Sequence, residues 1–331
     1  MPLHDTRYQH WDGAHLGIWR RRATIARNAL KGCWQNKWTR YVVSVCWTLS
    51  LTQAMVLFLI GQLLVKDSSL YDWVDQLHPQ MQALVRSFVA WLEVNPKISV
   101  GVTQSLLFSV FGWPLRILTL VAIALAIPHL VTRDLGSQAI TIYAAKALTR
   151  MDYILGKLGG LLGLMALTWL GPLLAAWFVG NLLGPSWHFF WHSRAALGAV
   201  LLYVGPAMVF LGLLALGISA ISAQEKATVS IWIGLWLLGN SLVPIARETR
   251  AWLKYASLTF DLDQISLAIF DPVAHIRVAQ ENVPLVGMLL QDLPARKLAV
   301  WAHPELAGAL IGLGIMLAAA LFILYLRIKP E

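Results

Sequence analysis

Six apolar stretches long enough to cross a bilayer constrain this chain more than any other feature. A spanning helix needs about 20 predominantly apolar residues, and such stretches occur at 41–65, 102–131, 153–182, 195–221, 227–246 and 306–326. Only 13% of the 331 residues are charged, about half the share of a soluble domain, and the mean hydropathy is +0.63. No strand pattern accompanies these stretches, so we predict an all-α integral membrane protein with six transmembrane helices.

The N-terminal arm, residues 1–40, precedes the six-span domain at 41–331. Apolar positions recur at three- and four-residue spacing between Leu16 and Trp38, with Arg and Lys between them. This pattern predicts a basic amphipathic helix lying in the membrane interface; the alternative is a helix that docks on a partner. We expect no cleavable signal peptide, because no short apolar core lies within the polar, basic arm, and the first span then acts as its own anchor.

Two further segments are too polar to span. A helical stripe from Leu70 to Leu92 carries charges off its apolar face, which predicts an external surface helix after the first span. The 57 residues from Arg247 to His303 contain three prolines. We predict that they form an external segment before the last span, or alternatively a re-entrant pair of short helices around Val283 to Leu290.

The distribution of basic residues predicts the orientation. With the N-terminus inside, the inner segments hold fifteen Lys and Arg residues, whereas the two short outer segments hold four. This excess predicts a multi-pass protein of the cell (inner) membrane with both termini in the cytoplasm. The net charge of +9 is concentrated next to the spans, which favours membrane lipid as a partner and argues against nucleic acid.

Motifs that would give this chain its own chemistry are missing from the sequence. It contains no GxxxxGK[ST], HExxH or GxSxG motif, so we expect neither a nucleotide site nor an enzyme, and no cofactor or metal in this chain. Cys33 and Cys46 have no metal-ligand spacing, which favours small, reduced apolar residues. His188 and His192 are four residues apart but lie among aromatic residues, which favours an interfacial belt over a metal site.

The connection between the second and third spans, residues 127–160, is more informative. A break at Gly136 and a short amphipathic helix from about Ser137 to Ala147 are expected there. Thr149 and Asp152 have the spacing of a capping box that would start the third span. Lys157 is expected to extend toward the lipid headgroups. A short helix held between two spans would pass an applied force to both of them.

This connection resembles the equivalent loop in permease subunits of type-2 ABC transporters, and most closely the branch known as multi-copper enzyme maturation permeases. The resemblance is carried by Arg133-Asp134 and by the run from Arg150 to Lys157, RMDYILGK. It implies an exporter or lipid-flipping permease that pairs with a second permease half and binds ATPase subunits, which use ATP and Mg²⁺. The residues it assigns to ATPase coupling are Arg133, Asp134, Ser137, Tyr143, Lys146, Arg150, Asp152 and Lys157.

Arg116 interrupts the second span next to Pro114. The apolar run from Ile117 to Val131 covers about 22 Å at 1.5 Å per residue, which places Arg116 toward the outer third of the bilayer. Its side chain either extends to the outer interface or contacts an anionic group in a central pathway or dimer seam. Otherwise the spans contain few ionisable residues, which weighs against the alternatives of an ATPase-independent carrier or a membrane-embedded enzyme. A structural or assembly subunit is a third alternative.

Overall fold

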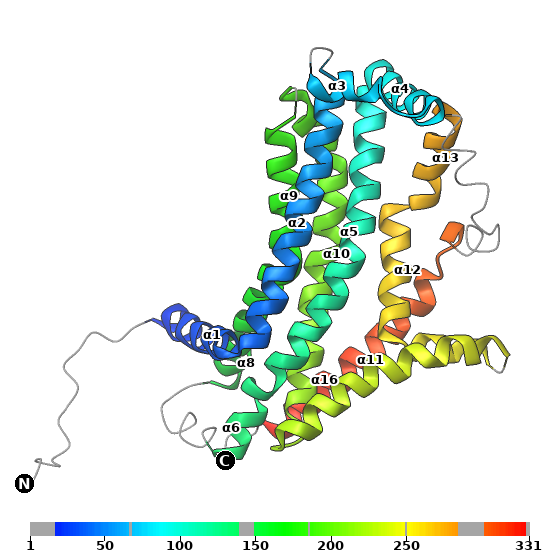
Figure 1. Cartoon of the computed structure of the whole chain (residues 1–331). Coiled ribbons are helices and arrows are strands. Elements are labelled where there is room, and N and C mark those ends of the chain that lie inside the picture. The colour runs from blue at the N-terminus through cyan, green and yellow to red at the C-terminus, as the bar shows by residue number, and fades with distance from the viewer. Residues whose placement is uncertain are drawn as a thin grey trace, which may run out of the picture.

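The computed structural model of this chain describes residues 17–65, 68–138, 149–184, 186–248, 250–283 and 301–328. Regular structure in those residues is entirely helical (Figure 1). Six helical stretches are long and apolar enough to cross a membrane: Lys37–Leu63, Pro96–Gly136, Arg150–Leu182, His188–Ser219, Glu225–Ala246 and Leu306–Arg327. The predicted all-α class with six spans is therefore confirmed.

Four spans run side by side as a bundle (Figure 1). They are α2 (Lys37–Leu63), α5 (Pro96–Ala126), α10 (His188–Ser219), and the pair α8 (Arg150–Met165) and α9 (Gly171–Leu182), which the π-helical turn η2 (Ala166–Leu170) joins. Helix α2 packs against α9 and α5, and α5 packs against α10. Large apolar side chains such as Leu120, Leu161 and Trp169 are fully buried between them. The fourth span begins at His188, seven residues before the predicted start, because the aromatic run ahead of Ala195 is already helical.

The basic amphipathic helix of the N-terminal arm is α1 (Ile18–Gln35), and it lies against α8. Gly156 and Gly160 of α8 allow the close approach. A Cβ atom at Gly156 would lie 2.7 Å from Ile25 Cβ, and one at Gly160 would lie 2.7 Å from the Ala26 carbonyl oxygen. Spacing two small residues by four is a known way to bring helix backbones together. Helix α1 therefore docks on the chain's own third span.

The apolar stripe after the first span forms two helices, α3 (Ser69–Val74) and α4 (Pro79–Val94). The prediction of one helix from Leu70 to Leu92 was wrong. Proline has no backbone N–H to donate into a preceding turn, so Pro79 begins α4 instead of continuing α3. The two helices lie across one end of the bundle, over α2 and α5 (Figure 1).

The last third of the chain lies beside the bundle. Helix α11 (Glu225–Glu248) runs out to one side, and η3 (Ala251–Ala256) leads back along it into α12 (Leu258–Phe270), α13 (Pro272–Asn282) and, farther along the chain, α16 (Leu306–Arg327) (Figure 1). Helix α12 packs against α16, α10 and α5. The short helices of this segment therefore precede the range predicted for a re-entrant pair. Within that range only Val283 is among the described residues, and it follows the end of α13.

Candidate functional site

Two groups of buried and partly buried polar side chains contain the candidate residues. The first, which we call the loop cluster, joins α1, α6 and α8 where the 139–148 connection begins and ends; it consists of Arg22, Asp134, Thr149, Asp152, Tyr153 and Lys157. The second, which we call the Arg116 cavity, lies between α5, α10 and α12. The loop cluster contains the predicted coupling residues Asp134, Asp152 and Lys157, and the cavity contains Arg116.

The loop cluster begins where the second span loses its regular helix. Helix α5 ends at Ala126 and is followed by a 3₁₀ turn, η1 (Ile127–His129), and by α6 (Thr132–Gly136). In this turn some backbone N–H and C=O groups have no hydrogen-bond partner within a helix. The hydroxyl of Ser219, buried at the end of α10, is their partner instead. Its Oγ accepts hydrogen bonds from Val131 N (2.9 Å) and Thr132 N (3.0 Å) and donates one to Ile127 O (2.9 Å). Helix α6 is thereby attached to the fourth span.

Lys157 connects α8 to α6. Its Nζ lies 2.7 Å from Asp134 Oδ2 and donates to Leu130 O at 2.7 Å. Tyr153, one turn earlier on α8, donates its hydroxyl to the same Asp134 oxygen at 2.7 Å. Only 9% of the Lys157 side chain is exposed, so the expectation that it extends toward lipid headgroups was wrong. The ammonium turns instead toward the carbonyl groups and the carboxylate at the end of the second span, where a positive charge is favourable.

Asp152 connects the start of α8 to α1. Thr149 is the N-cap of α8: its Oγ1 accepts from Asp152 N at 3.1 Å and donates to Asp152 Oδ2 at 2.7 Å, which confirms the predicted cap. The other Asp152 oxygen forms an ion pair with Arg22 Nε of α1 at 2.6 Å. Sequence reasoning missed Arg22, because nothing in a basic surface helix indicates which arginine faces the protein.

The remaining coupling residues assigned by the resemblance are more peripheral. Arg133 is exposed, and Ser137 donates to its carbonyl oxygen at 2.9 Å. Ser137 follows the last residue of α6, and Gln138 after it has a left-handed φ of 54°; the rest of the helix expected from about Ser137 to Ala147 lies outside the described residues. The Arg150 guanidinium lies 6.0 Å from the ring centre of Tyr325 on α16. Tyr143 and Lys146, with most of the predicted coupling helix, lie outside the described residues.

Arg116 is buried inside the bundle. Its Nη1 donates to the Tyr203 hydroxyl of α10 at 2.9 Å, and its Nη2 forms an ion pair with Asp263 of α12. Only 3% of the Arg116 side chain is exposed, so the guanidinium does not extend to the outer surface. Its anionic partner belongs to the same chain. Tyr203 and Asp263 were missed, although two aspartates in the otherwise apolar run LTFDLDQISLAIF were a usable signal.

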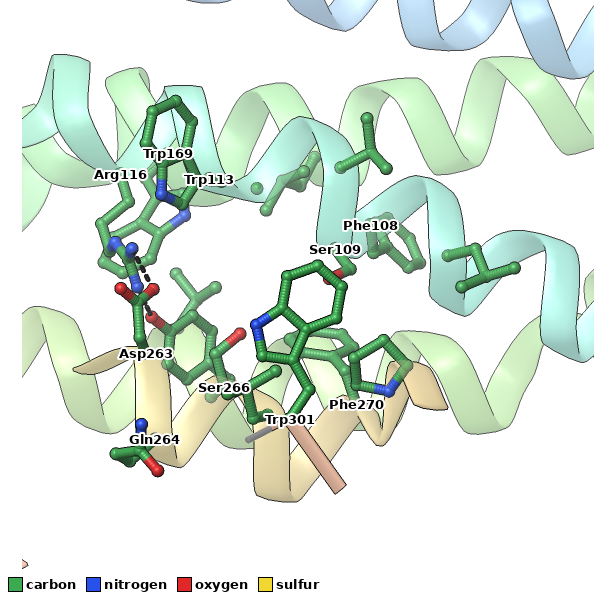
Figure 2. A pocket seen from close by; sticks show the side chains of 18 of the residues that line it. Phe108, Ser109, Trp113, Arg116, Trp169, Asp263, Gln264, Ser266, Phe270 and Trp301 are labelled. Carbon is green, nitrogen blue, oxygen red and sulfur yellow. Dashed lines mark hydrogen bonds and ion pairs between the residues drawn. The ribbon is translucent and has the colours of Figure 1, made fainter. Parts of the chain in front are cut away.

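The Arg116 cavity has a volume of about 450 Å³. Figure 2 shows Arg116, Asp263 and two tryptophans, Trp113 and Trp169, at one end, with Phe270 and Trp301 farther along. Buried polar atoms lacking a hydrogen-bond partner among the described residues include Arg116 Nε and Trp169 Nε1 in the cavity wall. Both carboxylate oxygens of neighbouring Asp261 are in the same state, and Asp261 is fully buried.

His188 and His192 stack on the first turns of α10, with ring centres 6.3 Å apart. Among the described residues no three His, Cys, Asp or Glu side chains form a metal-binding group.

No family model matches this chain, and no curated protein is significantly similar to it. The function must therefore be argued from the two polar sites and the motif around them.

Proposed function

We propose that this chain is the membrane-spanning permease subunit of an ATP-driven transporter of the type-2 ABC class. Separate ATPase subunits would bind the connection at 139–148 on the cytoplasmic side, use ATP and Mg²⁺, and drive a substrate across the membrane. A second permease half would complete the pathway. The observation that supports this proposal best is the loop cluster, which holds both ends of that connection to the spans.

The mechanical argument rests on how the two ends are held. On the N-terminal side, α6 is joined to α10 through Ser219 and to α8 through Asp134. On the C-terminal side, Thr149 and Asp152 fix the first turn of α8 and join it to Arg22 of α1. The hydrogen bonds to the Asp134 and Asp152 carboxylates are charge-assisted, and such bonds are stronger than neutral ones. A displacement of the connection would therefore move the second and third spans and α1 together.

A transport assay with matched charge removals tests the proposal. The chain is copurified with its ATPase and reconstituted in liposomes, and ATP turnover and transport are measured together. Lys146→Ala and Tyr143→Ala are expected to lower transport per ATP hydrolysed. Arg86→Ala is the control, because Arg86 of α4, at the opposite end of the bundle, forms an exposed ion pair with Asp75 (2.6 Å). Failure to recover any ATPase with the chain would contradict the proposal.

One observation favours a second function, that of a carrier independent of an ATPase. The spans were expected to offer few facing ionisable residues besides Arg116, but α12 places Asp263 against Arg116 and buries Asp261 next to Gly312 of α16. Ionisable groups at such positions commonly line ion or proton pathways. Uptake driven by a pH gradient into liposomes that contain this chain alone would favour the carrier, whereas a strict requirement for ATP and a second protein would exclude it.

A further inference from the structure

We propose that the Arg116 cavity binds an amphipathic molecule with an acidic head group, a carboxylate or a phosphate, and an apolar tail. Its volume of about 450 Å³ is within the usual range of small-molecule sites, about 300–1,000 Å³. The walls beyond the polar end are largely apolar and include Leu106, Phe108, Leu267 and Phe270. A tail would lie along these walls, with the head group beside Arg116.

Two unused donors determine the charge of the head group. Arg116 and Trp169 line the cavity, and their Nε and Nε1 atoms are buried donors that have no acceptor among the described residues. A buried donor without an acceptor is unfavourable, and such groups commonly mark a missing ligand or water. Because both atoms can only donate and one belongs to a guanidinium, an anionic oxygen satisfies them best.

Asp263 occupies the place that a ligand anion would take. It neutralises Arg116 through Nη2, yet 43% of its side chain is exposed, so one side of the carboxylate is not covered by the protein. Exchange of Asp263 for a ligand carboxylate or phosphate would keep the buried guanidinium paired throughout. Val110 and Trp113 of α5 also line the cavity and are 65% and 59% exposed. The cavity therefore reaches the outer face of α5, where an amphiphile can enter from the side.

Binding in this cavity goes beyond the proposed transport function, since it needs neither ATP nor a partner protein. As an assignment of the transported substrate, it rests on that function. The experiment below contains no ATPase, so its result is independent of whether the 139–148 connection couples to one.

The test measures the binding of radiolabelled palmitate to the whole chain in phosphatidylcholine nanodiscs. Hexadecyl phosphate is expected to compete, because it has the same kind of tail and an acidic head. Hexadecyltrimethylammonium, which has the same tail and the opposite charge, and inorganic phosphate, which has no tail, are expected not to compete. Equal competition by the two hexadecyl compounds, or competition by inorganic phosphate at the concentration at which hexadecyl phosphate competes, would overturn the proposal.

Two changes at the ion pair should act in opposite directions. Asp263→Asn removes the internal competitor and is expected to tighten palmitate binding about tenfold, roughly 1.4 kcal/mol. The double variant Arg116→Met/Asp263→Leu removes both charges together, which spares the fold an unpaired buried charge, and should weaken binding by about tenfold or more. Unchanged palmitate binding in the folded double variant would overturn the assignment. So would weaker binding in folded Asp263→Asn.

A steric variant tests the same site without touching a charge. Gly112 lines the cavity, and a Cβ atom there would meet nothing within 4 Å, so Gly112→Phe is expected to narrow the cavity and weaken binding. Gly198 of α10 is equally open and is not in the cavity lining. Gly198→Phe is therefore the matched control and should bind palmitate as the wild type does. Normal binding by Gly112→Phe would place the ligand elsewhere.

Discussion

Asp134 and Lys157 form an ion pair, with 2.7 Å between Oδ2 and Nζ, although they lie on opposite sides of the 139–148 connection. Their side chains are 15% and 9% exposed. The pair closes the connection at its base, so the second and third spans meet there through side chains as well as through the chain itself.

A double-mutant cycle on this pair should reveal strong coupling. Lys157→Met leaves a mostly buried carboxylate with one donor fewer, and we expect a loss of unfolding free energy of about 3 kcal/mol. Asp134→Asn combined with Lys157→Met should lose less than the sum of the single changes, with a coupling free energy of about 1–3 kcal/mol. Chemical unfolding of the purified chain in detergent measures all three variants. Additive losses would show that the pair contributes nothing.

The N-cap of the third span gives a smaller and more local prediction. Thr149→Ala removes the oxygen that accepts from Asp152 N, and we expect a loss of about 1 kcal/mol. Thr149→Ser keeps that oxygen and should remain within about 0.5 kcal/mol of the wild type. Thermal unfolding of the two variants side by side decides whether the hydroxyl, and not the methyl group, carries the effect.

Ser219 should matter much more than an ordinary helix serine. Ser219→Ala leaves two buried backbone N–H groups, those of Val131 and Thr132, without their acceptor, so a loss of about 1–3 kcal/mol is expected. Ser241 is the matched control, because its exposed hydroxyl only donates to Leu237 O within its own helix. Ser241→Ala should change stability by less than about 0.5 kcal/mol. Similar losses in both variants would show that α6 does not depend on Ser219.

A pH dependence is expected where η3 meets the start of α16. The Lys254 ammonium, 2.7 Å from Glu305 Oε1, and the donated Tyr255 hydroxyl hold the pKa of Glu305 below its ordinary value of 4.5. The same hydrogen bond to Glu305, with burial, raises the pKa of Tyr255 to about 12, so the phenol stays protonated near neutral pH.

Because folding lowers the pKa of Glu305, its stabilisation is present above pH 4.5 and is lost as the pH falls below that value. The side chain is 46% exposed, so the effect should be only about 0.5 kcal/mol and weaker in high salt. Melting temperatures between neutral pH and pH 3 measure it. Glu305→Gln should flatten this part of the profile, whereas Glu281→Gln on the exposed face of α13 should leave it unchanged.

Composition and periodicity were sufficient to predict the membrane-spanning helices, whose length and apolar character follow from the bilayer. Long apolar runs predicted six spans, and the spacing of Thr149 and Asp152 predicted the start of the third, because both signals are contained within one helix. The same local reasoning predicted the α1 helix and favoured the membrane interface for it, but it did not predict the contact with α8. That contact depends on Gly156 and Gly160, which permit the close approach of α1 from elsewhere in the chain.

Partners separated by many residues were decided by the tertiary structure alone. Lys157 was expected to extend toward lipid and Arg116 to interrupt an apolar span, since sequence shows a charge but not the group that compensates it. Folding brings Asp134 to the first and Asp263, 147 positions away, to the second. A buried charge is tolerated only when it is paired. The apolar sequence therefore determined that this chain enters a membrane, and the tertiary contacts of α6 with α8 and of α5 with α12 decided where its charges meet.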